Sequence, residues 1–277
     1  MTIDQLVELA IAEDKGTGDH TSLACIPQGK QNKALLLVKE PGIIAGLDVA
    51  VEIFKKIDSG LKTELYKKDG DVVVKGDIAF FVEGNAHSIL LAERLVLNIM
   101  QRMSGIATIT NKVVKQLDGL KTKVLDTRKT TPLLRALEKK AVKIGGGENH
   151  RMGLYDMILI KDNHIDYAGG MANAIDAAVN YLEKNSLHLE IEVETRSLEE
   201  VKMVLDKGNI HRIMLDNFSF DDLKKAVQMI NGKYETEASG GITPENARSY
   251  AETGVDFISL GALTHSVKSI DLSLKAC

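Results

Sequence analysis

Hydrophobic and polar positions follow two different rhythms along this 277-residue chain. In roughly the first hundred residues, helical patterns alternate with short apolar runs that glycines interrupt, and the runs at 33–40 and 72–84 are typical of strands. Apolar positions at helical spacing predict a long helix from about Ser88 to Met103. The first part of the chain is therefore expected to combine helices with a sheet.

From about residue 120 onward, strand-like runs alternate regularly with amphipathic helical segments. Thr131 with Pro132, and Thr243 with Pro244, are expected to begin two of these helices as an N-cap and a first-turn proline. Such alternation predicts parallel strands in a barrel or an open sheet. An eight-stranded barrel needs roughly 200 residues or more, so the shorter stretch available favours an incomplete barrel. The six runs cover 123–127, 156–162, 189–194, 211–216, 234–239 and 255–262.

Composition narrows the class of protein. The chain is 44% hydrophobic and 27% charged, which is typical of a globular protein with a proper core. Its formal net charge of -4 argues against general nucleic-acid binding. Cys25 and Cys277 have no metal or redox spacing, and no apolar run approaches the roughly 20 residues of a membrane span. We therefore expect a cytoplasmic protein that binds neither nucleic acid nor membrane.

Nearly every predicted strand of the second part ends in polar or glycine residues. The carboxyl ends of parallel strands meet at one mouth, where the active sites of such barrels lie. A single polar strand end is usually a cap or a turn, but six in succession indicate a site. These ends are Asp126 to Lys129, Lys161 to His164, Glu192 with Glu194, Asp216 with Asn217, Ser239 to Gly241, and Gly261.

A group of basic side chains and a group of acidic side chains are expected to lie at this mouth. Arg128, His150, Arg151 and Lys161 would form a positive pocket suited to a small ligand with more than one negative charge. Glu194 and Asp216 resemble a site for hydrated Mg²⁺, which takes one or two carboxylates together with substrate phosphates. These acids could equally serve to neutralise the cations, and we expect both roles. The glycine turns at 239–241 and 260–262 offer backbone amides to phosphate.

Seven segments resemble, in chain order, the motifs of the quinolinate phosphoribosyltransferase family. The pairing of DTRKT with NHR is the most specific feature, and the similarity runs from about residue 12 to residue 270. The segments are AERLVLNIMQRMSGIAT, DTRKTTPLLRALEKKAV, GGGENHRMGLYDMILIKDNH, EIEVE, LDNF, EASGGI and GVDFISLGALTHS.

The resemblance implies the type II phosphoribosyltransferase fold. An N-terminal α/β sandwich domain would cover residues 1–105, with the tail 266–277 returning to it. An open, incomplete α/β barrel would cover residues 106–265. It also implies Mg²⁺-dependent transfer of phosphoribosyl from phosphoribosyl pyrophosphate to quinolinate, with decarboxylation to nicotinate mononucleotide. A homodimer with shared active sites is implied, and higher oligomers stay open.

The resemblance also assigns roles to individual residues. By spacing alone, Arg94 is more simply a surface residue of its helix, whereas the family places it in the partner's active site. Lys129, Lys161, Glu194 and Asp216 would act in catalysis, and Glu194 and Asp216 would hold the metal. The substrate-binding set comprises Arg94, Thr127, Arg128, Lys129, His150, Arg151, Lys161, Glu194, Asp216, Ser239, Gly240, Gly241, Leu260, Gly261, Ala262 and His265.

One departure and three rival interpretations accompany the resemblance. Leu133 stands where the family usually has glycine, and we expect altered loop packing with retained chemistry. The nearest rival is a related phosphoribosyltransferase, for nicotinate or in a paralogue tied to molybdenum transport. An aldolase-like lyase would use Lys161 as a Schiff base. A non-catalytic phosphate-binding barrel is the third possibility.

Overall fold

The structure, a computed structural model, describes residues 2–277 and separates into two compact units. The first unit comprises the chain up to Asn111, the segment Thr131–Gly146 and the terminal segment Val267–Cys277. The second unit comprises Lys112–Thr130 and Gly147–Ser266. No helix among the described residues is both long and apolar enough to cross a membrane.

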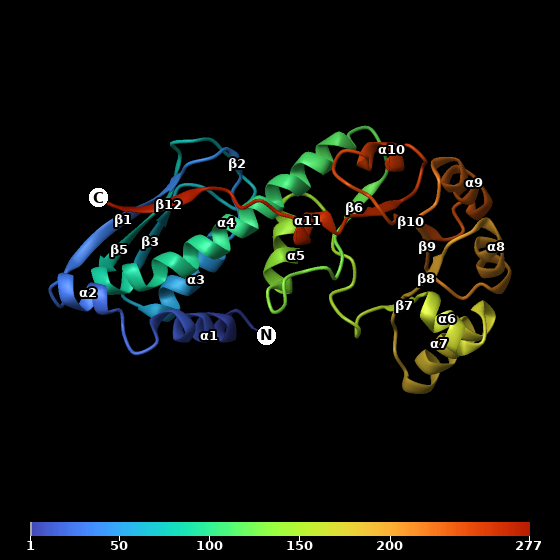
Figure 1. The fold of residues 1–277 in the computed structure, drawn as a ribbon, viewed down its shortest axis with the longest axis horizontal. Helices are drawn as coiled ribbons and strands as arrows, with labels where there is room; N and C mark the ends of the chain where they lie inside the picture. The colour runs from blue at the N-terminus through green and yellow to red at the C-terminus, as the bar shows by residue number, and fades with distance from the viewer. Residues whose placement is uncertain (1) are drawn as a thin grey trace. The chain divides into compact units, whose positions relative to one another are not determined.

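The first unit is built on a four-stranded antiparallel sheet in the order β12-β1-β5-β3, with a separate β2-β4 pair (Figure 1). Alternate residues of β1 are buried, as its apolar alternation predicts. Phe54 of α3 packs edge-on against Phe80 of β5, with 5.7 Å between the ring centroids. The strands are β1 (Gln31–Val38), β2 (Gly42–Ile43), β3 (Lys62–Leu65), β4 (Val72–Val73), β5 (Ile78–Asn85) and β12 (Leu272–Ala276), and the helices are α1 (Ile3–Lys15), α2 (His20–Cys25), α3 (Leu47–Ile57), α4 (Ala86–Gln116) and α5 (Arg135–Ile144).

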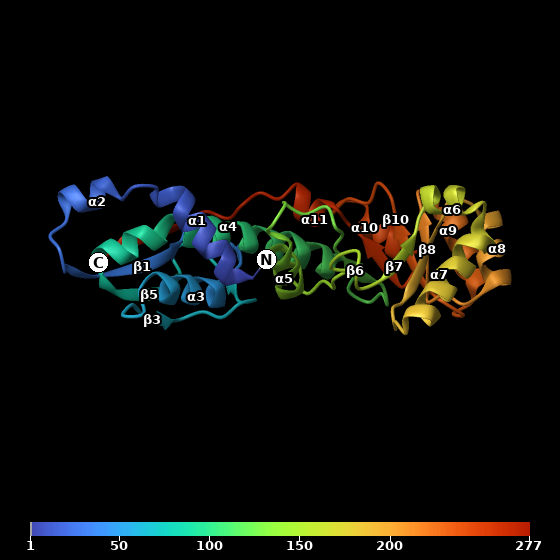
Figure 2. The ribbon, with the colours of Figure 1, turned by 90° about the horizontal axis from the view of Figure 1, so that it is seen from below.

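The second unit confirms the prediction of six parallel strands. They form one sheet in the order β6-β11-β10-β9-β8-β7, and β6 and β7, consecutive in the chain, lie at opposite edges. The sheet is therefore an open barrel, with α7, α8 and α9 on its outer side (Figure 2). The strands are β6 (Lys123–Leu125), β7 (Ile158–Ile160), β8 (Ile191–Thr195), β9 (Arg212–Asp216), β10 (Glu235–Ser239) and β11 (Phe257–Ser259), and the helices are α6 (Asp162–Ala168), α7 (Met171–Asn185), α8 (Leu198–Lys207), α9 (Phe220–Ile230), α10 (Ala247–Ala251) and α11 (Ala262–His265).

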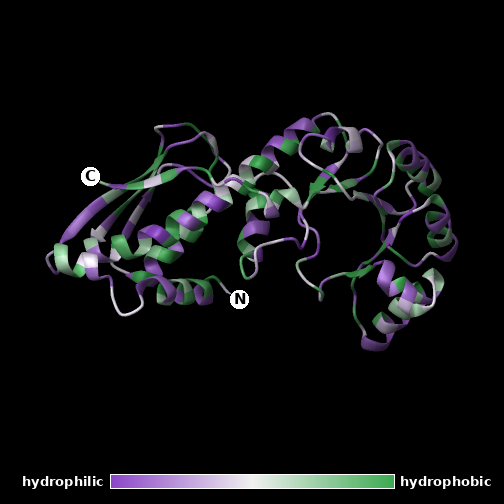
Figure 3. Ribbon diagram, in the orientation of Figure 1, coloured by the Kyte–Doolittle hydropathy of each residue, from purple (hydrophilic) through white to green (hydrophobic). Residues whose placement is uncertain are grey.

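Local sequence explains the outer helices. Ser197 accepts a hydrogen bond from the Glu200 amide at the start of α8, and Ser219 accepts one from the Asp222 amide at the start of α9. Each of these helices buries one apolar stripe and carries hydrophilic residues on the rest of its surface (Figure 3). The helices thus seal the outside of the barrel and leave its interior mouth to the strand ends.

Three predicted helix boundaries were wrong. The helix expected to end near Met103 continues to Gln116 and includes Gly105, where a Cβ would meet the Lys268 carbonyl oxygen at 2.4 Å. Thr131 with Pro132 does not begin a helix, since α5 starts at Arg135. Likewise Thr243 with Pro244 precedes α10, which starts at Ala247 with Asn246 as its N-cap residue.

The segment around α5 is grouped differently from the sequence-based domain boundaries. Residues 131–146 were expected in the barrel domain of 106–265, whereas the structure assigns them to the first unit. The buried Glu138 explains part of this grouping. Its carboxylate accepts hydrogen bonds from Arg102 Nε at 2.7 Å and from the Thr131 amide at 3.1 Å. An ion pair with α4 thus anchors the segment.

Leu133 adopts a backbone conformation that favours glycine. Its φ is 69°, and its side chain is 70% exposed. A Cβ in this left-handed region crowds the following carbonyl oxygen, at a cost of roughly 1–2 kcal/mol. The backbone here is thus the one that a glycine would adopt freely, and the leucine side chain projects away from the protein.

Candidate active site

A cavity of about 1020 Å³ opens at the carboxyl ends of the strands of the second unit. Fourteen of the sixteen residues predicted to bind substrate line it: Thr127, Arg128, Lys129, His150, Arg151, Lys161, Glu194, Asp216, Ser239, Gly240, Gly241, Gly261, Ala262 and His265. Leu260 does not, because it is fully buried behind the strand end. Arg94 is an exposed residue of α4 in the first unit.

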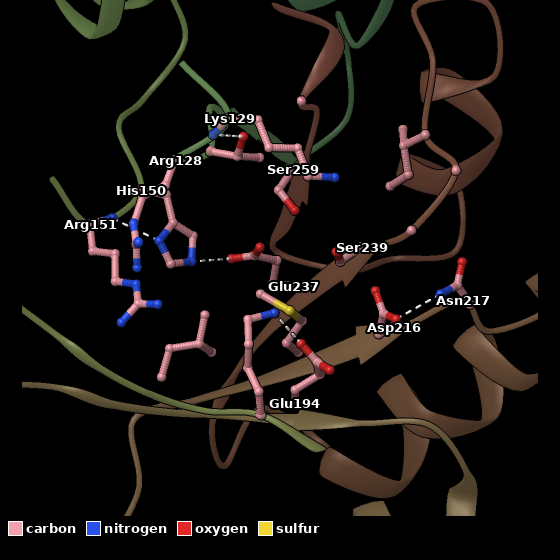
Figure 4. Close-up of a pocket in the computed structure, with 18 of the residues that line it drawn as sticks. Arg128, Lys129, His150, Arg151, Glu194, Asp216, Asn217, Glu237, Ser239 and Ser259 are labelled. Atoms are coloured by element: carbon pink, nitrogen blue, oxygen red, sulfur yellow. Dashed lines mark hydrogen bonds and ion pairs between the residues drawn. The ribbon is translucent and has the colours of Figure 1, made fainter. Parts of the chain in front are cut away.

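Cationic side chains occupy one side of the cavity (Figure 4). Arg128 and Lys129 follow β6, and Arg151 is the arginine of the NHR motif in the loop before β7. Burial, and next the charge of Arg128, lowers the pKa of the Arg151 guanidinium. Its Nη1 donates to the Met157 carbonyl oxygen at 3.3 Å. The two guanidinium groups thus form a partly desolvated positive surface, which favours an anionic ligand.

Both ring nitrogens of His150 are engaged within the protein. Its Nδ1 accepts a hydrogen bond from the Arg151 amide at 2.7 Å. Its Nε2 lies 2.9 Å from Glu192 Oε2 and donates to it. The contact of Nδ1 with the Arg151 amide helps to position Arg151, and the ring still lines the cavity.

Acidic side chains occupy the facing strand ends. Glu194 is the last residue but one of β8, and its Oε2 accepts a hydrogen bond from Lys161 Nζ at 2.5 Å. Asp216 ends β9, and its Oδ2 accepts from Asn217 Nδ2 at 2.7 Å. Each carboxylate has a second oxygen in addition to the one so engaged. The pair fits a hydrated Mg²⁺, which needs only one or two protein carboxylates beside the phosphates of a ligand.

The turn after β10 lets backbone approach a ligand closely. Gly240 has a φ of 91°, and a Cβ at this position would meet Asn217 Oδ1 at 2.2 Å. Gly241 follows with a φ of 62° and open space around it. Successive residues with positive φ turn amide groups toward one side, an arrangement that suits phosphate oxygens.

Sequence reasoning placed Glu192 at the cavity mouth and gave no role to Arg212 or Glu237, whereas all three are buried. Barrel interiors are usually filled by branched apolar residues, but here Glu192, Arg212 and Glu237 lie inside. Arg212 Nη1 lies 3.3 Å from Glu237 Oε2, and Arg212 Nη2 lies 2.8 Å from Glu235 Oε2. The signal was present in the runs 190–194 and 234–239, where acids alternate at the period of two that places them on one strand face.

Burial perturbs the acids of this group. It raises the pKa of Glu192 to about 7, although Arg212 opposes the shift. It also raises the pKa of Glu237 to about 8, and the charge of Glu192 adds to the effect. Burial disfavours the charge on Arg212, but Glu192, Glu235 and Glu237 outweigh it and raise its pKa. The Arg212 guanidinium thus interacts with three carboxyl groups. The two buried ones, Glu192 and Glu237, are partly protonated near neutral pH.

These buried residues do not make a good metal site. Ligand atoms of His150, Glu192 and Glu237 all lie within 4.8 Å of one another. A metal on His150 Nε2 would require the ring proton to move to Nδ1, where the Arg151 amide already donates. The cluster is better described as a hydrogen-bonded set of carboxyl groups.

Comparisons with known proteins identify similar chains. The families described as the N-terminal and C-terminal domains of quinolinate phosphoribosyl transferase match residues 19–104 and 106–275. A protein of Arabidopsis thaliana named chloroplastic nicotinate-nucleotide pyrophosphorylase (carboxylating) is 50% identical, over 98% of this chain and 81% of that protein. A Bacillus subtilis protein named probable nicotinate-nucleotide pyrophosphorylase (carboxylating) is 43% identical, over 99% and 93%. The solved nicotinate-nucleotide pyrophosphorylase of Francisella tularensis has a TM-score of 0.92 and 41% identity, covering 99% of this chain and 96% of that one.

Proposed function

The chain belongs to the quinolinate phosphoribosyltransferase family, and from that membership we propose that it transfers phosphoribosyl from phosphoribosyl pyrophosphate to quinolinate with decarboxylation. The products are nicotinate mononucleotide, pyrophosphate and CO₂. One observation carries the proposal: a single cavity has guanidinium and ammonium groups on one side and two carboxylates with a glycine turn on the other. A dianionic ring and a sugar diphosphate match these two halves.

Quinolinate is assigned to the cationic half. Its two carboxylates require more positive charge than nicotinate, which has one. Arg128 and Arg151 offer planar forks that suit carboxylates, and Lys161 adds a third cation. These three groups supply positive charge that the second unit offers to the ring.

Phosphoribosyl pyrophosphate is assigned to the other half. The Gly240–Gly241 turn and the turn at Gly261 would donate amide hydrogens to phosphate. Glu194 and Asp216 would hold Mg²⁺, which when bound neutralises charge on the diphosphate. Lys129 lies in the same cavity and stabilises the negative charge that grows on pyrophosphate as it leaves.

The reaction then follows from the positions of these groups. The ring nitrogen of quinolinate bonds to the anomeric carbon while the bond to pyrophosphate breaks. Glu194 and Asp216 lie beside the positive charge that develops on the ribose. The nitrogen is now cationic, so the ring accepts the electron pair left when the neighbouring carboxylate departs as CO₂. That carbon must finally take a proton.

A shared active site in a homodimer is part of the proposal. Arg94 is exposed, and among the described residues it forms no salt bridge. We assign it to the quinolinate pocket of a partner chain, where it would add a further cation. The expected cytoplasmic location stays a prediction.

The assay supplies the purified protein with quinolinate, phosphoribosyl pyrophosphate and Mg²⁺, and follows nicotinate mononucleotide and CO₂. Nicotinate in place of quinolinate should give little product, which tests the nearest rival. Arg128→Ala should abolish turnover while the fold is retained, and full turnover by the folded variant would refute its assigned role. Borohydride trapping tests the lyase alternative, which the salt bridge of Lys161 to Glu194 disfavours because a Schiff base needs a neutral amine.

Mixed dimers test the shared site. Arg94→Ala chains mixed with Lys129→Ala chains should recover about one quarter of wild-type activity, because half of the random dimers regain one intact site of two. Lys129→Ala mixed with Asp216→Ala is the control, and it should recover nothing because both changes lie in the same half-site. Absence of recovery in verified Arg94→Ala mixtures would contradict the partner role.

A further inference from the structure

Glu237 lies at the floor of the cavity and has no role so far. It occupies the middle of β10, paired in register with Met214 of β9 and Phe257 of β11. Its side chain is fully buried within the protein, yet it lines the cavity (Figure 4). A carboxyl group in that position is shielded from bulk water and lies at the wall of the cavity.

The groups around Glu237 set its charge. Glu192 on β8, His150 in the loop before β7, Arg212 on β9 and Ser259 on β11 face it. His150 Nε2 lies 3.5 Å from Glu237 Oε2 but donates at 2.9 Å to Glu192. Arg212 is divided between Glu237 and Glu235. Among the described residues, Glu237 Oε1 is buried and has no hydrogen-bond partner. A buried carboxyl group that shares its only guanidinium partner with another carboxylate is more stable as the neutral acid.

We propose that Glu237 is a catalytic acid of the decarboxylating stage, giving its proton to the ring carbon from which CO₂ departs. This inference rests on the proposed function. The carbon–carboxylate bond breaks, CO₂ leaves, and the electron pair stays on the ring carbon beside the cationic nitrogen. That pair then forms a C–H bond with the Glu237 proton. The carboxylate that remains lies 3.3 Å from Arg212 Nη1 and regains a proton from water after product release.

Glu237 suits this step better than Lys161, which also lines the cavity. The Lys161 ammonium is held at 2.5 Å by Glu194, so proton loss would break that ion pair. Glu237 instead gains an interaction when it ionises, because its negative charge strengthens the contact with Arg212. Burial raises its pKa to about 8, which keeps it protonated at neutral pH while leaving it acidic enough to donate.

The test separates the two stages of the reaction in Glu237→Gln. In single turnover, pyrophosphate release should stay within about threefold of wild type, whereas formation of nicotinate mononucleotide should slow roughly 100-fold, so that quinolinate mononucleotide accumulates. The dissociation constant of quinolinate should be unchanged. Glu235→Gln is the matched control, since it removes the other carboxylate that Arg212 binds, on the same strand but half exposed. It should behave as wild type.

Three results would overturn the inference. Nicotinate mononucleotide could appear as fast as pyrophosphate in Glu237→Gln. Quinolinate binding and pyrophosphate release could fall together, which would make Glu237 a structural residue. Glu235→Gln could show the same accumulation, which would point to Arg212 alone.

Wild-type protein and a second variant keep the test decisive if Glu237→Gln does not fold. The product-forming stage of wild type should slow as pH rises through about 8, and Glu237→Asp should retain part of the product-forming rate. A flat profile over that range would overturn the inference. A wild-type protein that makes no nicotinate mononucleotide would instead refute the proposed function itself.

Discussion

Replacing Arg212 by methionine should destabilise the second unit strongly, and more so at alkaline pH. The side chain is 10% exposed, and methionine can keep its apolar contact with the Phe257 ring, whose centroid lies 4.2 Å from the guanidinium carbon. The substitution removes the positive charge that interacts with Glu235 and Glu237. Glu235 is about half exposed, so its ion pair is worth at most about 1 kcal/mol. Glu237 is fully buried, and once it is ionised at alkaline pH, removing the partner of its charge costs up to about 3–5 kcal/mol.

The loss should depend on pH with a definite sign. Burial raises the pKa of Glu192 to about 7 and that of Glu237 to about 8, above the value of 4.5 that applies to an unfolded chain. The folded state therefore binds more protons than the unfolded state between these values, and stability falls as pH rises through them. The slope is about 1.4 kcal/mol per pH unit for each such proton. Arg212 lowers both pKa values, so its removal raises them further and extends the decline to higher pH.

Urea unfolding followed by circular dichroism measures this, since the chain has no tryptophan and guanidinium salts would screen the charges. At pH 8 the variant should lose about 3–5 kcal/mol of unfolding free energy. At pH 5.5, where the buried carboxyls are protonated, the loss should shrink to about 1–2 kcal/mol. Arg248→Met is the control, because Arg248 is exposed and pairs with Glu252 one helical turn away. Equal losses at both pH values would refute the electrostatic explanation and leave packing on Phe257.

Three further changes test other features. Gly240→Ala should weaken the binding of phosphoribosyl pyrophosphate at least tenfold more than Gly241→Ala does in equilibrium titrations. Both glycines have positive φ, but only a Cβ at Gly240 would collide with Asn217. Equal effects of the two substitutions would contradict this explanation. Leu133→Gly should raise the unfolding free energy by up to about 1 kcal/mol, because relief of the left-handed strain exceeds the entropy cost of glycine, and a loss of stability in urea would count against that strain. Lys129→Met should lower kcat roughly 100-fold in steady-state kinetics with little change in the KM for quinolinate, and an unchanged kcat would remove it from leaving-group stabilisation.

The six strands and the polar residues that follow them can be predicted from the sequence without a structure. Strand-like runs and helical segments alternate through short-range periodicity, which depends only on neighbouring residues. The carboxyl ends of parallel strands must share one mouth, so residues as distant as Lys129 and Gly241 could be placed in one cavity from their positions alone. The family motifs, which stand at the same strand ends, point to the same residues.

Other features depended on contacts between distant segments. The glycine inside α4 is explained by the backbone of Lys268, which packs where Gly105 has no side chain. The hydrogen-bond partners of His150 are one backbone amide and Glu192, 42 residues away. The sequence showed acids alternating along β8 and β10, but it did not show that they face one another around Arg212. The period of two along a strand shows which side chains share one face of the sheet. The curvature of the sheet determines which of these side chains come together in the interior. Their burial in that interior is what perturbs the pKa values of the acids.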